Sequence, residues 1–183
     1  MKTWLWVRWL LIFKCVGSAP RNFRIAVDDV SIKIFDAELL EKFDCQVLQI
    51  DNKSYVNCQI VLKRYVDQLK ARSILDFWKP NGQAMKLFDA RLDACLFMGS
   101  VHKNRFFNIY AKALKKYSNL KCPLKPNFTY TLEKLNLDEQ DFPAFVPLGS
   151  FRCNTEFTFN DSMSKAIRII VRGKILPRRS AAP

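Results

Sequence analysis

The residues of this chain that could do chemistry are its cysteines, one histidine and a pair of carboxylates. A cysteine nucleophile needs a base to lower the pKa of its thiol, and no motif links Cys153 to His102, the one histidine. The carboxylates of Asp89 and Asp93 lie four residues apart on an expected strand, and therefore on one face, but a shared face does not make an acid–base pair. These residues predict no catalytic site, and we expect a protein that is not an enzyme.

The sequence also lacks the motifs of metal and phosphate sites. The 6 cysteines include no CxxC pair, and a single histidine leaves a zinc site short of ligands. With 5 glycines, the chain contains neither a P-loop nor a dinucleotide-binding motif. We therefore expect no metal and no cofactor.

A secretory leader is predicted at the start of the chain. Residues 1–18 comprise a basic start, an apolar stretch rich in Trp and Leu, and small residues before Ala19. Arg8 and Lys14 interrupt the apolar stretch, which is too short and too charged to span a bilayer, because a spanning helix takes about 20 apolar residues. The alternatives are an amphipathic anchor or a buried first helix. We expect a signal peptide at 1–18, a secreted, extracellular protein, and one domain at 19–183 that ends in a short basic tail.

The cysteines and the sequons fit this compartment. Five cysteines follow residue 18, and in a secreted domain they indicate disulfides with one cysteine left over. The sequons at Asn52, Asn127 and Asn160 predict three glycosylation sites.

The body of the chain is dominated by the alternation of apolar and polar residues that is typical of half-buried strands. From Phe151 to Phe159 the odd positions are mostly apolar, and the even positions form a polar face. The segment Ala166–Ile175 alternates in the same way. A composition of 49% hydrophobic and 26% charged residues excludes a disordered chain. Recurring strands with few helical segments predict an all-β fold of two antiparallel sheets packed face to face.

One hairpin can be placed by its register. Ile50 and Lys53 flank a turn signal, and counting back from a turn that they close places Cys45 opposite Cys58. The pair falls on a non-hydrogen-bonded position, where opposed Cα atoms lie closest, so a cross-strand disulfide is plausible. The same turn exposes Asn52.

One amphipathic helix interrupts the strands. Phe106, Tyr110, Leu114 and Tyr117 follow the spacing of one helical face. The helix is expected to pack against a sheet or to close one end of the sandwich, and the alternative is a helix that lies on a membrane surface.

The stretch 81–97 contains an NG turn, a strand and a Asp-Ala-Cys motif followed by an aromatic residue. With the Asn-x-x-Cys-Pro element at 119–123, it resembles an insect-specific family of small secreted proteins of largely unknown function. That family is related to the ML lipid-recognition domains and includes contact-chemosensory proteins. Further matches are the surroundings of Cys45 and Cys58 and the start of a late strand at 147–151.

The resemblance implies an immunoglobulin-like two-sheet sandwich, an ML-like domain opened to hold an apolar ligand between its sheets. It also implies a disulfide between Cys95 and Cys122. Cys153 lies where the family usually shows no cysteine, and ML proteins often tie an early strand to a late one. The pairing of Cys45 therefore stays open between Cys58 and Cys153.

A ligand cavity needs inward-pointing apolar side chains. The candidates are Ile60, Leu62, Met85, Leu87, Leu96, Phe128, Tyr130, Phe151, Phe157, Phe159, Ile167 and Ile169. The function expected from the resemblance is a secreted, non-catalytic binding protein that carries or presents a small hydrophobic ligand, lipid or pheromone-like, in chemosensation. The alternative is a structural or receptor-binding sandwich with a filled core and no small-molecule ligand.

The formal charge of +13 bears on the other partners. The basic residues are dispersed and no nucleic-acid-binding motif accompanies them, so no nucleic acid is expected. An anionic lipid surface or a membrane receptor suits a basic secreted protein better. Lys112, Lys115 and Lys116 are candidates for a basic rim beside the cavity.

Overall fold

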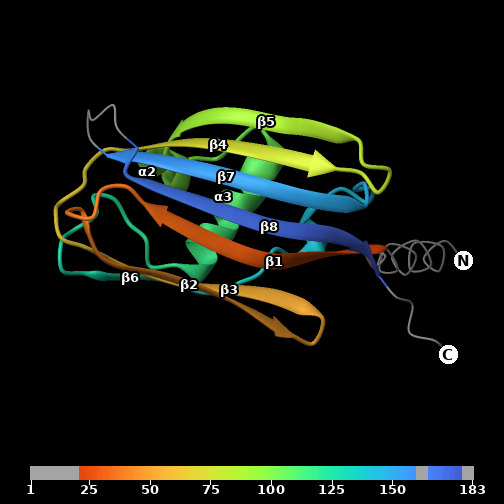
Figure 1. The fold of residues 1–183 in the computed structure, drawn as a ribbon, viewed down its shortest axis with the longest axis horizontal. Helices are drawn as coiled ribbons and strands as arrows, with labels where there is room; N and C mark the ends of the chain where they lie inside the picture. The colour runs from red at the N-terminus through yellow and green to blue at the C-terminus, as the bar shows by residue number, and fades with distance from the viewer. Residues whose placement is uncertain (1–20, 160–164, 179–183) are drawn as a thin grey trace, which may run out of the picture.

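The structure is a computed structural model, which describes residues 21–159 and 165–178 (Figure 1). The expected signal peptide at 1–18, the sequon residue Asn160 and the end of the basic tail after residue 178 lie outside the described residues.

The larger of two antiparallel sheets has five strands. Its order places β7 in the middle, β8 and β4 beside it, and β1 and β5 at the edges. The strands, in spatial order, are β1 (Phe23–Ile34), β8 (Ile167–Pro177), β7 (Gly149–Phe159), β4 (Leu69–Trp78) and β5 (Ala84–Asp93).

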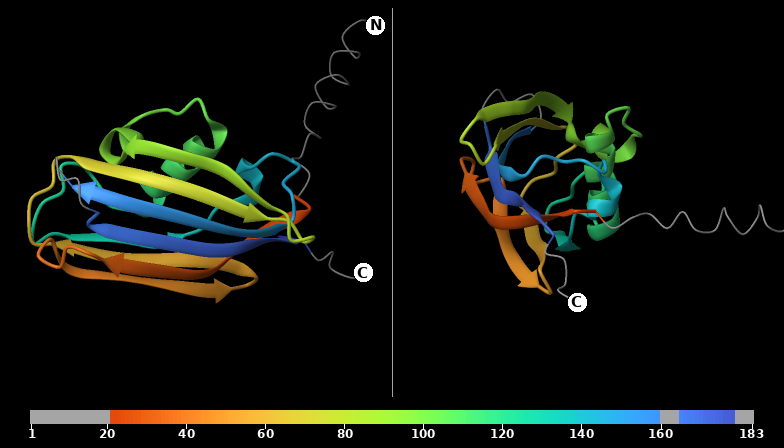
Figure 2. Two further views of the ribbon diagram at one scale, coloured as in Figure 1. Left: turned by 45° about the horizontal axis from the view of Figure 1, so that its top comes forward. Right: turned by 90° about the vertical axis from the view of Figure 1, so that its right-hand side faces the viewer.

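The smaller sheet has three strands: β2 (Leu40–Ile50), β3 (Lys53–Leu62) and β6 (Thr129–Leu135). It lies against the inner face of the larger sheet on the side of β1 (Figure 2). The prediction of an all-β protein built from two sheets is confirmed.

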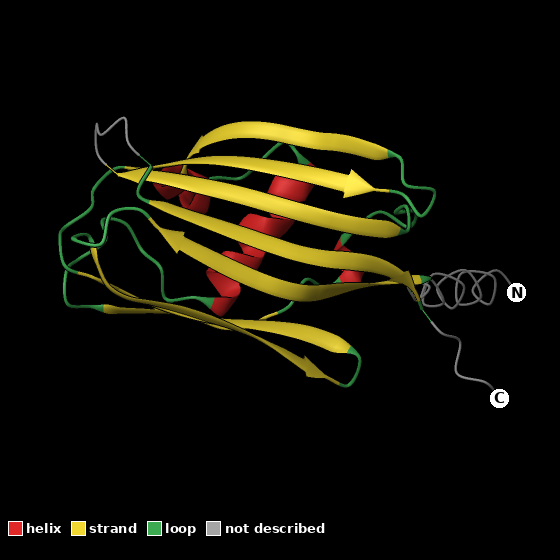
Figure 3. Cartoon of the chain, viewed as in Figure 1, coloured by secondary structure: helices red, strands yellow, loops and turns green. Residues whose placement is uncertain are grey.

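The described residues form two α-helices rather than the single helix expected. The amphipathic segment forms α3 (Arg105–Tyr117), which lies on the inner side of the five-stranded sheet, next to the three-stranded sheet (Figure 3). Helix α2 (Ala94–Gly99) was not expected. It begins because the Asp93 side chain accepts a hydrogen bond from the backbone N–H of Leu96 and so caps the first turn. A 3-10 turn, η2 (Glu139–Asp141), follows β6.

The core consists of two separate clusters. The first joins the β7–β8 end of the larger sheet to the loops and strands around it, and its buried members are Leu39, Leu40, Leu62, Val66, Leu69, Leu124, Tyr130, Ala166 and Ile167. The second lies toward the other end of the sandwich, with Phe23, Ile25, Ile109 and Phe142 buried. The odd-numbered residues of β7 reach both clusters, since Phe157 packs against the first and Phe151 against the second.

Ion pairs cover the outer face of the five-stranded sheet. The expected polar face of β7 is present, but Glu156 is almost fully buried within it, with 9% of its surface exposed. Its carboxylate accepts hydrogen bonds from Lys165 and Arg168, both at 2.8 Å. Burial by itself raises the pKa of Glu156, but these two hydrogen bonds outweigh it and hold the pKa below its usual value. The carboxylate is therefore an ion while the protein is folded.

Candidate functional site

Two disulfides are present, one across the β2–β3 hairpin of the small sheet and one at helix α2. Ile50 faces Lys53 and Cys45 faces Cys58 in the β2–β3 hairpin, the register that the sequence predicted. The structure joins Cys45 to Cys58 across the two strands, with Cα atoms 4.1 Å apart. Because these residues share the face of Ile60, which packs on the first core cluster, the disulfide lies on the inner face of the small sheet.

The second disulfide joins Cys95 of α2 to Cys122, in the segment that leads to β6, with Cα atoms 5.7 Å apart. This is the pairing that the resemblance implied. Cys153 is the free cysteine of the described chain, so the alternative of a Cys45–Cys153 bond is absent from the structure.

Several inward-pointing residues in the middle of the large sheet are only partly buried, although Leu75, which pairs with Cys153, is buried. Cys153 and Thr155 on β7, Ser73 on β4 and Val171 on β8 all point inward, since they share a face with Phe151 and Phe157. Each of these four side chains keeps some accessible surface, although all of them lie on interior strands of the five-stranded sheet. The two packed clusters lie on either side of this region.

Three of these side chains form a small polar group in an otherwise apolar surface. Ser73 stands opposite Thr155, and their hydroxyl oxygens are 2.9 Å apart. The Sγ atom of Cys153 is 3.5 Å from the Ser73 oxygen and 3.8 Å from the Thr155 oxygen. The inward face thus presents two hydroxyls and a thiol close together.

Tyr110 of α3 faces the same region. Surrounding protein raises the pKa of its hydroxyl, and a smaller contribution comes from Cys153. Even so, 43% of the residue's surface is accessible. Tyr110 is thus not tightly packed by its neighbours.

The cavity candidates from the sequence divide into two groups. Eight lie on or beside the inner faces with little or partial exposure: Ile60, Leu62, Tyr130, Phe151, Phe157, Phe159, Ile167 and Ile169. Of these, Leu62, Tyr130 and Ile167 are buried members of the first core cluster.

The other four candidates lie at the border of the sandwich. Leu96 belongs to α2 rather than to a strand and is 68% exposed. Leu87 is the unpaired residue of a bulge in β5, because Leu75 pairs with Phe88 and Asp76 with Lys86. Met85, near the start of β5, and Phe128, before β6, are also exposed. An alternating pattern could not show these irregularities, since a bulge or a short helix changes the side to which a residue points.

Ser73, Thr155 and Tyr110 were not among the candidates. Thr155 and Cys153 occupy inward positions of an alternating segment that the sequence analysis recognised, so a polar residue at an inward position was the available signal. The sequence offered no such signal for Ser73, because its neighbour Thr155 is 82 positions away in the chain.

The residues considered for catalysis have separate structural roles. His102 is half-buried, with its ring stacked on Phe97 and Nε2 2.8 Å from the carbonyl oxygen of Phe97. Asp93 caps α2, and Asp89 forms a bidentate ion pair with Arg72. Within 21–159 and 165–178, no three His, Cys, Asp or Glu side chains gather as a metal site.

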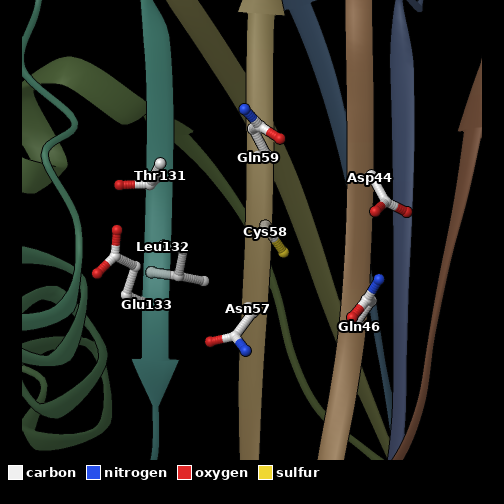
Figure 4. A pocket seen from close by; sticks show the side chains of 8 residues that line it. All are labelled: Asp44, Gln46, Asn57, Cys58, Gln59, Thr131, Leu132 and Glu133. Atoms are coloured by element: carbon white, nitrogen blue, oxygen red, sulfur yellow. The ribbon is translucent and has the colours of Figure 1, made fainter.

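A polar hollow lies on the outer face of the small sheet (Figure 4). It has a volume of about 350 Å³ and is lined by β2, β3 and β6, with carboxylates from Asp44 and Glu133 and the amide of Gln59. This open, polar surface offers little for a hydrophobic ligand.

The lysines proposed as a rim are exposed on α3. Lys112, Lys115 and Lys116 are all exposed side chains of this helix, whose buried residues are Ile109, Ala111 and Ala113. No helix among the described residues is long and apolar enough to cross a membrane.

Comparisons with known proteins give a family match for the middle of the chain. A family model described as "Protein of unknown function (DUF1091)" matches residues 71–153, from β4 to the middle of β7. No curated protein matches the sequence. One similar solved structure is that of a Niemann-Pick type C2 protein from Japanese carpenter ant, with 16% identity and a TM-score of 0.37, covering 79% of this chain and 98% of that chain. The family match includes Ser73, Tyr110 and Cys153 but ends before Thr155.

Proposed function

We propose that the protein is a secreted, non-catalytic carrier that binds a small hydrophobic molecule between its two sheets. The observation that carries the proposal is the accessible surface of inward-pointing residues midway between the two core clusters. In a filled sandwich, side chains such as Cys153 and Thr155, on a central strand, would be among the most buried. A space in front of them also accounts for the accessible surface of Tyr110.

The walls of this space suit an apolar ligand. Phe151, Phe157 and Ile169 line the large sheet, and Ile60 faces them from the small one. Burial of the ligand's apolar surface supplies about 25 cal/mol per Å², from which the costs of association are subtracted. The two disulfides hold the small sheet and α2 in place before the ligand arrives, which lowers the cost of ordering the site.

The wider setting follows from the sequence. The leader at 1–18 supports secretion, and the resemblance to ML-like chemosensory proteins supports a lipid or pheromone-like ligand. The exposed lysines of α3 provide positive charge for contact with an anionic lipid surface or a membrane receptor. Glycans on the sequons Asn52, Asn127 and Asn160 belong to the same proposal.

A tryptophan placed in the proposed space tests the function. Val171→Trp adds a large ring on the inward side of β8, and Ile170→Trp, its neighbour on the outward side, is the matched control. We expect Val171→Trp to fold with nearly unchanged stability and to lose binding of a fluorescent apolar probe, N-phenyl-1-naphthylamine, whereas the control keeps it.

A filled core predicts the opposite result. The added ring would then overpack the interior and lower the free energy of unfolding by about 1–3 kcal/mol. If Val171→Trp is destabilised in this way and the wild-type protein binds no probe at micromolar concentration, the structural or receptor-binding alternative holds.

A further inference from the structure

We infer that Ser73, Thr155 and Tyr110 form a polar anchor inside the sandwich, which selects an uncharged ligand with a hydroxyl or carbonyl group on an apolar body. The inference rests on the proposed function and adds the chemical class of the ligand. It starts from the position of the Ser73 and Thr155 hydroxyls, which lie in the partly buried middle of the inner face and not at its border.

The Ser73–Thr155 pair has unused hydrogen-bonding capacity. Each hydroxyl carries one donor and two acceptor lone pairs, and the bond between them uses one donor and one acceptor. One hydroxyl proton and several lone pairs remain, and the nearby thiol of Cys153 is only a weak partner. The pair can therefore donate one hydrogen bond to a ligand and accept another.

Tyr110 adds a second donor from the opposite wall. Among the residues that the structure describes, no hydrogen-bond partner faces its hydroxyl, although the ring packs near Phe97 with centroids 6.3 Å apart. A tyrosine hydroxyl keeps its proton at physiological pH, and the surrounding protein raises the pKa of Tyr110 further. A hydroxyl without a protein partner can form its hydrogen bond with a ligand that supplies one.

Among the described residues, the inward neighbours of Ser73 and Thr155 carry no charge that would balance an ionic ligand. The residues next to Ser73 and Thr155 in their strands include Arg72 and Glu156, which face each other on the outer side of the sheet. The inward neighbours Leu75, Phe157 and Val171 are apolar. A carboxylate placed among them would lose its hydration without gaining a cation, and this penalty is large. A neutral polar group loses far less and recovers it through the anchor.

A matched set of probes tests the anchor. We would measure the displacement of N-phenyl-1-naphthylamine from the full mature chain by dodecanol, dodecane, dodecanoate and cholesterol. The wild-type protein should bind dodecanol about 3- to 10-fold more tightly than dodecane, the effect of one net hydrogen bond, and dodecanoate more weakly than dodecanol. The ranking of cholesterol against dodecanol shows whether the apolar body is a sterol or a single chain.

Variants test whether the preference for dodecanol over dodecane comes from the anchor residues. The near-isosteric double change Ser73→Ala with Thr155→Val, and Tyr110→Phe alone, should each reduce the preference for dodecanol over dodecane while the dodecane affinity stays unchanged. Thr158→Val, on the outward side of β7, should leave both affinities as they are. If the double variant does not fold, the wild-type ranking and Tyr110→Phe still decide.

The outcomes separate this inference from the proposed function. Equal affinity for dodecanol and dodecane, or tighter binding of dodecanoate, overturns the anchor and leaves a carrier of apolar molecules. Failure of the wild-type protein to bind the fluorescent probe at all overturns both.

Discussion

Ser73 and Thr155 stand directly opposite each other on β4 and β7, with their hydroxyl oxygens 2.9 Å apart. They interrupt the apolar inner face at the point where one packed cluster ends and the other begins. A hydrophobic side chain at either position would extend the core through the centre of the sandwich. The pair thus coincides with the region that remains accessible.

The free thiol of Cys153 reports whether the interior is occupied. Cys153 lies beside the Ser73–Thr155 pair, so a bound ligand should shield it. We expect N-ethylmaleimide to label Cys153 several-fold more slowly in the presence of dodecanol than in its absence, measured by mass spectrometry. In a Cys153→Ser background, Thr158→Cys on the outward side should label at one rate under both conditions. Equal labelling of Cys153 with and without a bound ligand would place the ligand elsewhere.

Removal of the disulfides should destabilise the protein according to the loops that they close. Cys95 and Cys122 are 27 positions apart, so replacing both by serine should lower the free energy of unfolding by about 3.5 kcal/mol in the chain-entropy model. The Cys45–Cys58 loop spans 13 positions, and its removal should cost about 3 kcal/mol. Urea unfolding measures both values. Cys153→Ser should change little, and a loss as large as that of a disulfide variant would show that Cys153 is paired.

Glu156 should make stability depend on pH in the acidic range. Its pKa in the folded protein lies below the ordinary value of 4.5, so its contribution is fully present above that pH and is lost as the pH falls through the folded-state pKa. Glu156→Gln should therefore be less stable than the wild type at pH 7, by about 1–3 kcal/mol, and the difference should shrink at pH 3. Urea unfolding at both pH values is the measurement, with the exposed Glu41→Gln as control. A constant difference would contradict the role given to the ion pairs with Lys165 and Arg168.

Asn52 should carry a glycan after secretion from eukaryotic cells. It is an exposed residue of the β2–β3 turn, where its φ is 62°. Asn52→Gln should reduce the mass of the secreted protein by one glycan, whereas Asn81→Gln, in the β4–β5 turn but outside any sequon, should leave it unchanged. An unchanged mass for Asn52→Gln would refute this prediction.

The features that the sequence could predict are those set by near neighbours in the chain. The β2–β3 register follows from a turn of two residues, and the helix at α3 follows from a stripe of side chains within 13 residues. Helix α2 could not be predicted in this way, because its 6 residues are too few to show a period and its start depends on the cap by Asp93.

The candidate site depends on pairings between distant segments. Strand β4 pairs with β7, and only this pairing brings Ser73 to Thr155. The bulge that displaces Leu87 likewise depends on how β5 meets β4. Alternation could identify which residues of one strand share a face, but not which residues of another strand they would meet.

The bulge at Leu87 has a consequence for how molecules of this protein meet at high concentration. Strand β5 is an edge of the five-stranded sheet, and a regular edge strand would offer its free backbone groups to the edge of another molecule. The extra residue breaks the regular spacing of these groups, and the charged side chains of Lys86 and Arg91 flank it. Aggregation of molecules through this edge of the sheet is thereby disfavoured.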